Sequence, residues 1–290
     1  MVLPRTREPA VITPPHNTSH MQAPLIQPST AETPTTDAQP EYIKRWDVHR
    51  GDIWELGRHR IMCGSSTNDQ DVAALLAGVE PDTIITDPPY CSGGWQEAGK
   101  ASGSIGQRAK TLIKRDQLST RGYCSLIKTA ILTREIPHIY VFCDWRMWVY
   151  LFDLVEAQGY GVRSMIVWDK QSMALGVGWR AQHEIIMFAT HGGAAFDKHC
   201  GHGNVINCPR TRNEYHPTEK PLKLLAQLIN TSAWCRDIYD PFAGSGSTII
   251  AAEQTGRACW AMELDPGYVA AAIERFYRAT GDWPQCINRP

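Results

Sequence analysis

The chain has 290 residues, 43% of them hydrophobic and 20% charged, which is enough for one sizeable domain with insertions or at most two small domains. Its net charge of −1 and isoelectric point near 6.8 exclude a globally basic protein, so any contact with nucleic acid must come from local clusters of Lys and Arg. No apolar run reaches the length of a membrane span, and nine irregularly spaced cysteines suggest no disulfide framework, which favours a cytoplasmic protein.

The first 40 residues differ in composition from the rest of the chain. Residues 1–40 are rich in Pro, Thr, Ser, Gln and Ala and show no helical or strand period. Such a composition cannot bury enough surface to offset the backbone entropy lost on folding. We therefore expect a disordered tail at 1–40 and a globular domain at 41–290.

From about residue 46 the pattern alternates between strands and helices. Short apolar runs predict strands at 59–63, 82–86, 139–143, 163–168, 184–189, 238–240 and 258–263. Helical periodicity predicts helices at 122–134, 145–157, 219–232, 247–255 and 266–279. This alternation favours an α/β fold with a mostly parallel sheet covered by helices on both faces.

Two basic, glycine-rich stretches near 91–121 and 191–215 fit neither period. Loops this long inside a compact domain are usually functional, and their cations are candidates for contacting phosphates. These candidates are Arg108, Lys110, Lys114, Arg115, Arg121, Arg210 and Arg212. Arg180, between two predicted strands, is a further candidate, and an ion pair with Glu184, four residues on, is an equal alternative.

The tetrapeptide Asp87-Pro88-Pro89-Tyr90 follows a predicted buried strand. An ionised Asp87 and the carbonyl of Pro88 only accept hydrogen bonds, and neither proline has an N–H. Such a pocket suits a group with two N–H donors, such as an exocyclic amino group. Two acceptors would also direct the nitrogen lone pair toward an incoming methyl group, and Tyr90 offers a flat face for an unstacked base. A plain proline-rich turn is the alternative.

A second motif, Asp240-Pro241-Phe242-Ala243-Gly244-Ser245-Gly246-Ser247-Thr248, joins a strand to a helix through glycines. Glycines permit close approach of a ligand, and the helix N-terminus supplies free N–H donors. The pattern is neither a dinucleotide fingerprint nor a P-loop. Because Glu263 ends the next strand, its carboxylate could accept hydrogen bonds from ribose hydroxyls. A ligand with ribose but no pyrophosphate fits better than NAD, and a plain glycine-rich turn is the alternative.

The third motif, His216-Pro217-Thr218-Glu219-Lys220-Pro221, precedes a predicted helix. Thr218 could cap that helix, and Lys220 could meet an anionic group such as an amino-acid carboxylate. By itself the motif is equally consistent with a simple helix cap.

Together the three motifs resemble the amino-methylating DNA methyltransferases, and their order is similar to that of the circularly permuted β class. The resemblance covers about residues 46–281 and implies a Rossmann-like, seven-stranded, mostly parallel sheet with one antiparallel strand. It also implies S-adenosylmethionine as the cofactor, double-stranded DNA as the substrate and a homodimer. The stretch at 51–60 is similar to the start of methylase domains in this family.

The resemblance assigns roles to the motif residues. Asp87, Pro88, Pro89 and Tyr90 would form the catalytic motif, with Asp87 and Pro88 holding the target amino group. Residues around the cofactor would be Asp240, Phe242, Gly244, Ser245, Gly246, Glu263, Thr218 and Lys220. One departure concerns position 65: relatives often have Gly-Asp where this chain has Gly64-Ser65, and that Asp commonly helps to hold the adenine of the cofactor.

Three alternatives remain at this level. Asp at the head of the tetrapeptide favours adenine N6, whereas relatives acting on cytosine N4 more often carry Ser. An inactive DNA-binding relative is the second alternative, motivated by Ser65. A zinc site is the third, but His199, Cys200, His202 and Cys208 match no paired ligand spacing, so we expect no metal.

Overall fold

The computed structural model describes residues 41–89, 118–174, 178–192, 201–211, 219–232 and 235–289. The predicted tail at 1–40 lies outside these ranges, as does most of the basic stretch near 91–121. The described residues all belong to one compact unit. Within them, no helix is both long and apolar enough to cross a membrane.

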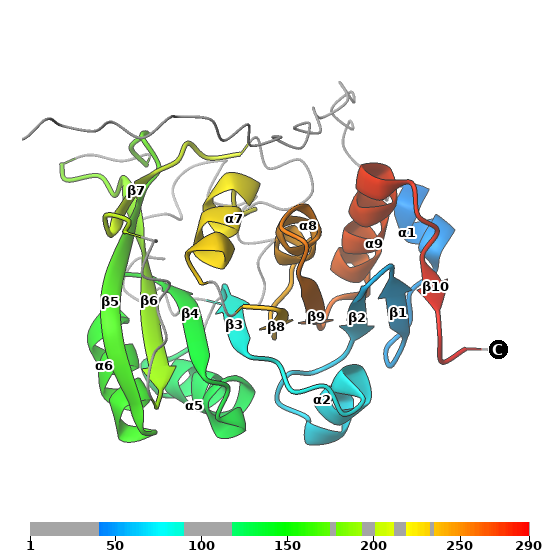
Figure 1. Cartoon of the computed structure of the whole chain (residues 1–290), viewed down its shortest axis with the longest axis horizontal. Helices are drawn as coiled ribbons and strands as arrows, with labels where there is room; N and C mark the ends of the chain where they lie inside the picture. The colour runs from blue at the N-terminus through cyan, green and yellow to red at the C-terminus, as the bar shows by residue number, and fades with distance from the viewer. Residues whose placement is uncertain are drawn as a thin grey trace, which may run out of the picture. The chain divides into compact units, whose positions relative to one another are not determined.

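A single sheet crosses this unit, with the strand order β10-β1-β2-β9-β8-β3-β4-β6-β5-β7 (Figure 1). The strands are β1 Ile53–Leu56, β2 His59–Cys63, β3 Thr83–Thr86, β4 His138–Cys143, β5 Tyr160–Asp169, β6 His183–His191, β7 Val205–Asn207, β8 Asp237–Asp240, β9 Ala258–Glu263 and β10 Gln285–Cys286. From β2 to β4 all neighbours in this order are parallel. β6 runs antiparallel to both β4 and β5, and β1 runs antiparallel to both β2 and β10.

The α/β class and the mostly parallel sheet are confirmed, but the predicted count of seven strands is wrong. The described residues form ten strands, two of which run against the others. The extra strands β1, β7 and β10 are two to four residues long and lie at or next to the sheet edges. Strands this short hold too few alternations to produce a periodic signal.

Helices cover both faces of the sheet, as expected (Figure 1). One face carries α1 Glu41–Trp46, α7 Leu222–Thr231, α8 Ser247–Gln254 and α9 Pro266–Thr280, and the other carries α2 Asp69–Leu76, α5 Thr120–Ala130 and α6 Trp148–Ala157. Strand β4 shows how the two cores are separated. Tyr140 and Phe142 pack into the first core, whereas Ile139 and Val141 pack into the second, because successive side chains of a strand point to opposite faces.

Local signals explain where several elements begin. The helix predicted at 219–232 begins at Leu222, because Pro221 before it is extended (φ −61°, ψ 130°). Helix α2 escaped the sequence analysis although it carries a cap: Asn68 accepts hydrogen bonds from the backbone N–H groups of Gln70 and Asp71. Its fully buried residues are only Val72 and Leu75, which is too little for a clear period.

Candidate active site

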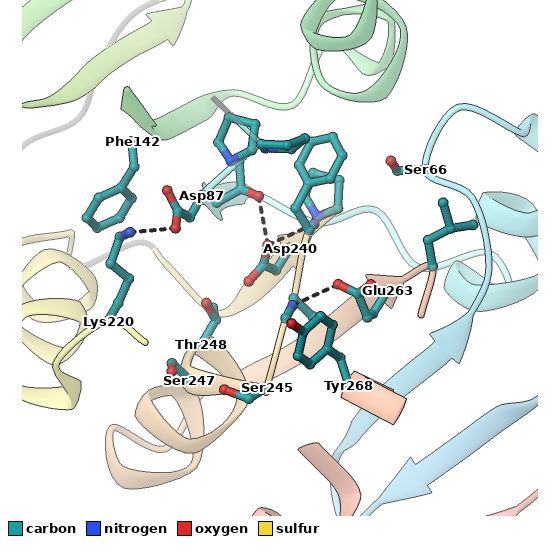
Figure 2. A pocket seen from close by; sticks show the side chains of 18 of the residues that line it. Ser66, Asp87, Phe142, Lys220, Asp240, Ser245, Ser247, Thr248, Glu263 and Tyr268 are labelled. Carbon is teal, nitrogen blue, oxygen red and sulfur yellow. Dashed lines mark hydrogen bonds and ion pairs between the residues drawn. The ribbon is translucent and has the colours of Figure 1, made fainter. Parts of the chain in front are cut away.

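A cavity of about 760 Å³ opens where several parallel strands end (Figure 2). Asp87 follows β3, Asp240 is the last residue of β8, and Glu263 is the last residue of β9; all three line the cavity. The carboxyl ends of parallel strands meet at one edge of a sheet, which is where α/β proteins place ligands. This shared edge brings together motifs that are more than 150 residues apart in the chain.

At one end of the cavity, Asp87 is bound by a lysine. Oδ2 of Asp87 accepts a hydrogen bond from Nζ of Lys220 at 2.5 Å, and Figure 2 shows the Lys220 side chain pointing toward this carboxylate. Lys220 lies in the segment just before α7, 133 residues from Asp87. The sequence suggested that Lys220 meets the carboxylate of a ligand, but its ammonium contacts protein carboxylates.

Lys220 has a second carboxylate partner in Glu184 of β6. The Nζ of Lys220 lies 3.2 Å from Oε2 of Glu184, and Nζ of Lys170 lies 2.9 Å from Oε1 of the same carboxylate. Burial by itself would lower the pKa of Lys220, but Asp87 and Glu184 outweigh burial and the pKa is raised. Burial would likewise raise the pKa of Glu184, yet Lys220 and Lys170 hold that pKa below its usual value.

The glycine turn between β8 and α8 lies on the opposite side of the site. Gly246, the residue before α8, has φ +75°, a left-handed conformation that favours glycine. A Cβ atom at this position would lie 2.8 Å from the Cβ of Ala272 on α9, so no larger side chain fits without movement. The turn therefore lies close against α9 and opens the first turn of α8, with its N–H groups, toward the cavity.

Asp240 connects the two motifs. It is buried, and its Oδ1 accepts hydrogen bonds from the Thr86 hydroxyl at 2.7 Å and the Phe242 N–H at 3.1 Å. Burial raises the pKa of Asp240 to about 6. Because Thr86 immediately precedes Asp87, this bond holds the Asp87 tetrapeptide against the glycine turn.

Glu263 lies beside the glycine turn. Its Oε2 accepts a hydrogen bond from the Gly244 N–H at 3.0 Å, and its Oε1 accepts one from the Asp265 N–H at 2.8 Å. Burial raises the pKa of Glu263 to about 7. The carboxylate is thus oriented by two backbone donors at the cavity wall, where ribose hydroxyls could reach it.

The segment around Ser65 forms the cavity wall next to Glu263. Ser65 lines the cavity, its N–H donates to Oδ2 of Asp71 at 2.7 Å, and its hydroxyl lies 2.8 Å from that of Thr67. Asp265 and Tyr268, from the start of α9, line the same cavity. These two residues were missed by the sequence analysis, although Asp265 caps α9 before a proline, which is a readable signal.

The structure brings most predicted site residues together and leaves others apart. Pro88, Pro89, Phe242, Gly244 and Ser245 line the cavity together with Asp87, Lys220, Asp240 and Glu263, whereas the predicted residue Gly246 does not line it. Seven predicted residues lie outside the described ranges: Tyr90, Arg108, Lys110, Lys114, Arg115, Arg212 and Thr218. Arg121, Arg180 and Arg210 are exposed, and none of them lines the cavity.

The alternative ion pair between Arg180 and Glu184 is wrong. The guanidinium of Arg180 contacts the sulfur of Met173 at 3.2 Å, and Glu184 is bound by Lys170 and Lys220 instead. The sequence pointed to Glu184 only as a partner of Arg180. Its position in the cavity wall was missed, since nothing local indicates which strand neighbours the tetrapeptide.

Of the zinc candidates, His199 and Cys200 lie outside the described residues. Cys208 is buried, and its carbonyl accepts a hydrogen bond from the Trp168 indole at 2.6 Å. In the part of the chain that the structure describes, no group of three or more His, Cys, Asp or Glu residues is arranged to hold a metal.

Solved structures of DNA methyltransferases share this fold, among them the two that follow. The complex of M1.HpyAVI with S-adenosylmethionine superimposes with a TM-score of 0.54 at 20% identity, covering 74% of this chain and 98% of that chain. The cytosine-N4-specific PvuII DNA methyltransferase gives a TM-score of 0.57 at 15% identity, covering 76% and 86%. At these identities the likeness concerns the fold alone.

Comparison with proteins of similar sequence shows the family to which the chain belongs. Residues 198–274 match the DNA methylase model of the N6/N4 methyltransferases. The DNA adenine methyltransferase YhdJ of Escherichia coli K12 is 40% identical over 79 residues, 25% of this chain and 27% of that protein. The protein named "Putative methylase YubD", of the same organism, is 30% identical over 207 residues, 70% of this chain and 85% of YubD. The chain therefore belongs to the N6/N4 family of DNA methylases, whose methyl donor is S-adenosylmethionine.

Proposed function

We propose that this protein transfers a methyl group from S-adenosylmethionine to the N6 amino group of an adenine flipped out of double-stranded DNA. The observation that carries the proposal is the single cavity that Asp87 and Pro88 share with the glycine turn and Glu263. A volume of about 760 Å³ is in the usual range for a site that encloses a small ligand.

At the Asp87 end, acceptors would face the target amino group. The Asp87 carboxylate and the Pro88 carbonyl accept hydrogen bonds, and the two prolines offer no competing donor. Accepting both amino hydrogens would direct the N6 lone pair away from the ring and toward the cofactor. As N6 gains positive charge, the Asp87 carboxylate stabilises it. The N–C bond would form as the methyl–sulfur bond breaks, S-adenosylhomocysteine would leave, and the surplus N6 proton would pass to water.

The residues at the other end fit the cofactor. Its sulfonium group supplies an electrophilic methyl when it is bound. An ionised Glu263 would accept hydrogen bonds from the two ribose hydroxyls, and the N–H groups at the start of α8 would face the methionine end. Gly246 keeps this turn free of side-chain bulk.

Two observations support adenine as the target. Asp rather than Ser heads the tetrapeptide, and the 40% identical relative is named as an adenine methyltransferase. Cytosine N4 remains the alternative, since the same acceptors suit any exocyclic amino group. The hypothesis of an inactive relative is disfavoured, because the cavity that Ser65 lines still contains the acidic residues and the glycine turn of the other motifs.

Contacts with DNA would come from exposed cations. Arg121, Arg180 and Arg210 are exposed outside the cavity and are suited to phosphate contacts. Phosphate contacts position the duplex, and the reacting base enters the cavity. A homodimer, a cytoplasmic location and the boundaries of the two basic insertions remain predictions.

Expression in a host without DNA methylation, followed by sequencing that detects modified bases, tests the proposal. We expect N6-methyladenine at one recurring sequence, and none in cells that carry an empty vector. Detection of N4-methylcytosine in place of N6-methyladenine would show that cytosine, and not adenine, is the target base. Unmodified DNA, obtained from cells in which the folded protein accumulates, would overturn the proposed activity.

A further inference from the structure

A chain of four charged side chains, two buried lysines and two half-buried carboxylates, lies at the acceptor end of the cavity. It runs from Asp87 through Lys220 and Glu184 to Lys170, with successive N···O distances of 2.5, 3.2 and 2.9 Å. The two lysine side chains are 8% and 5% exposed, and the two carboxylate side chains are 24% and 20% exposed. Two cations and two anions balance, so the cluster has no net charge.

Several elements hold this cluster in place. Glu184 stands opposite Trp168 in the β5–β6 pairing, and the N–H of Lys170 donates to the Gln182 carbonyl at 3.0 Å. The Trp168 ring lies 5.7 Å from Nζ of Lys170 and 6.0 Å from Nζ of Lys220. Phe142 lies 5.1 Å from Nζ of Lys220. Aromatic faces attract cations and exclude water, so both ammonium groups are confined.

We infer that Glu184 and Lys170 are positioning residues for methyl transfer: they fix Lys220, and Lys220 in turn fixes the orientation of the Asp87 carboxylate. A lysine has a flexible stem, so one contact alone would leave its ammonium free to rotate. The second contact, to Glu184, removes that freedom. The carboxylate of Asp87 is then held in the orientation that an amino group requires, before any base enters.

Charge balance gives Glu184 a second effect on Asp87. The charged or titratable groups near Asp87 in the described residues include Lys220, Glu184 on β6, Asp240 on β8 and Cys143 on β4, with Lys170 behind Glu184. Glu219, which also lines the cavity, is neutralised by Arg275 at 2.6 Å. Removing Lys220 would leave Asp87 among acids, whereas removing Glu184 would leave Lys220 with Asp87 as its main anionic partner.

The two removals should therefore shift the pH dependence of kcat in opposite directions. In Lys220→Met, the ionised form of Asp87 loses its cation, so the acid limb of kcat moves to higher pH, by at least about one unit. In Glu184→Gln, the surroundings of Asp87 become more positive, so the acid limb moves to lower pH. A merely structural defect would not produce shifts of opposite sign.

The inference rests on the proposed function, so the wild-type protein is assayed first, with tritiated S-adenosylmethionine and unmethylated bacterial genomic DNA. Failure of the wild type to transfer methyl overturns the proposed function. With an active wild type, we expect Glu184→Gln to lower kcat by roughly 10- to 100-fold at saturating cofactor, with the KM for S-adenosylmethionine changed less than threefold. Lys170→Gln should lower kcat less, and Glu184→Asp should restore part of it.

Glu253→Gln is the matched control. The Glu253 side chain is 30% exposed and binds two basic residues, Arg58 at 3.1 Å and His59 at 2.8 Å, but it does not line the cavity. Its kcat should stay within twofold of wild type. Wild-type kcat in both Glu184→Gln and Lys170→Gln, or acid limbs that move in the same direction, would overturn the inference. If Glu184→Gln does not fold, Lys170→Gln decides, because its folded form must show reduced kcat.

Discussion

The two ends of the cavity use different chemistry to hold their acidic groups. At the Asp87 end, the carboxylate is held by side chains, through Lys220 and Glu184 from other parts of the chain. At the Glu263 end, the carboxylate is held by backbone N–H groups of Gly244 and Asp265 within one local turn. The Asp87 carboxylate lies 2.5 Å from the ammonium of Lys220, whereas burial leaves Glu263, which is held by amide donors, with a pKa of about 7.

The different partners of Asp87 and Glu263 fit the different roles that we propose for the two carboxylates. An acceptor that must stay ionised while its substrate gains positive charge benefits from a lysine behind it. A ribose-binding carboxylate can titrate near neutrality, since ligand hydroxyls supply the hydrogen bonds that favour its charged form. Four substitutions separate the two ends, ordered here from the largest expected effect to the smallest.

Asp87→Ala should separate catalysis from cofactor binding most strongly. It removes the acceptor that we propose stabilises the charge developing on the target nitrogen, so kcat should fall by about 100- to 1,000-fold. The Kd of S-adenosylhomocysteine, measured by calorimetry, should change less than threefold, because the glycine turn and Glu263 are unaltered. Asp153→Ala, an exposed acid on α6, serves as the control. Normal turnover in Asp87→Ala would contradict the assignment of its role.

Gly246→Val should damage the opposite end. Its φ of +75° disfavours a β-branched residue, and the new Cβ would lie 2.8 Å from that of Ala272. We expect the free energy of unfolding in urea to fall by about 3 kcal/mol and the affinity for S-adenosylhomocysteine to fall by about 100-fold. Gly256→Val is a matched control, since Gly256 has φ +70° but nothing lies within 4 Å of its Cβ position. Equal stability losses in both variants would show that the contact with Ala272 contributes nothing.

Glu263→Gln tests the titration of the cofactor end. In the wild type, affinity for S-adenosylhomocysteine should rise about tenfold between pH 6 and pH 8, as Glu263 ionises through its pKa of about 7. The variant should show no such rise. A wild-type Kd that is constant over this range would contradict ribose binding by the ionised carboxylate.

The stability of the ligand-free protein should respond with the opposite sign. A folded-state pKa above the unfolded value of 4.5 means that the protonated form favours folding. The contribution of Glu263 to stability is therefore full below about pH 4.5 and is lost as pH rises through about 7. Urea titrations of wild type and Glu263→Gln at pH 5 and pH 8 measure this difference.

Thr86→Val should have the smallest effect. It removes the hydroxyl donor 2.7 Å from Asp240, which joins the two ends, and it should lower the free energy of unfolding by about 1 kcal/mol. The pKa of Asp240, already about 6, should rise further because its charged form loses a donor. Thr83→Val is the control at the other end of β3, where the hydroxyl donates to Asp82. An effect on kcat larger than tenfold in Thr86→Val would mean that this bond contributes to catalysis directly.

Much of the fold was predictable because its signals are local. Strands β2 and β9 have the predicted bounds, 59–63 and 258–263, since each is a short segment of typical strand length with mainly apolar residues at its centre. Asp87, Asp240 and Glu263 each stand at a predicted strand end, and parallel strands present such ends at one edge. Local signals therefore predicted that each of the three side chains stands at a strand end, and the resemblance to the amino-methylating DNA methyltransferases implied that they share one site.

Only the tertiary structure decided which side chains surround Asp87, Asp240 and Glu263. The pairing of Asp87 with Lys220 spans 133 residues, and Glu184 reaches the site because β6 happens to be the neighbour of β4 and β5. Strand order and edge additions such as β1, β7 and β10 depend on packing between distant segments. Because such contacts leave no period and no local motif in the sequence, the charged chain behind Asp87 becomes visible only when the strands are side by side.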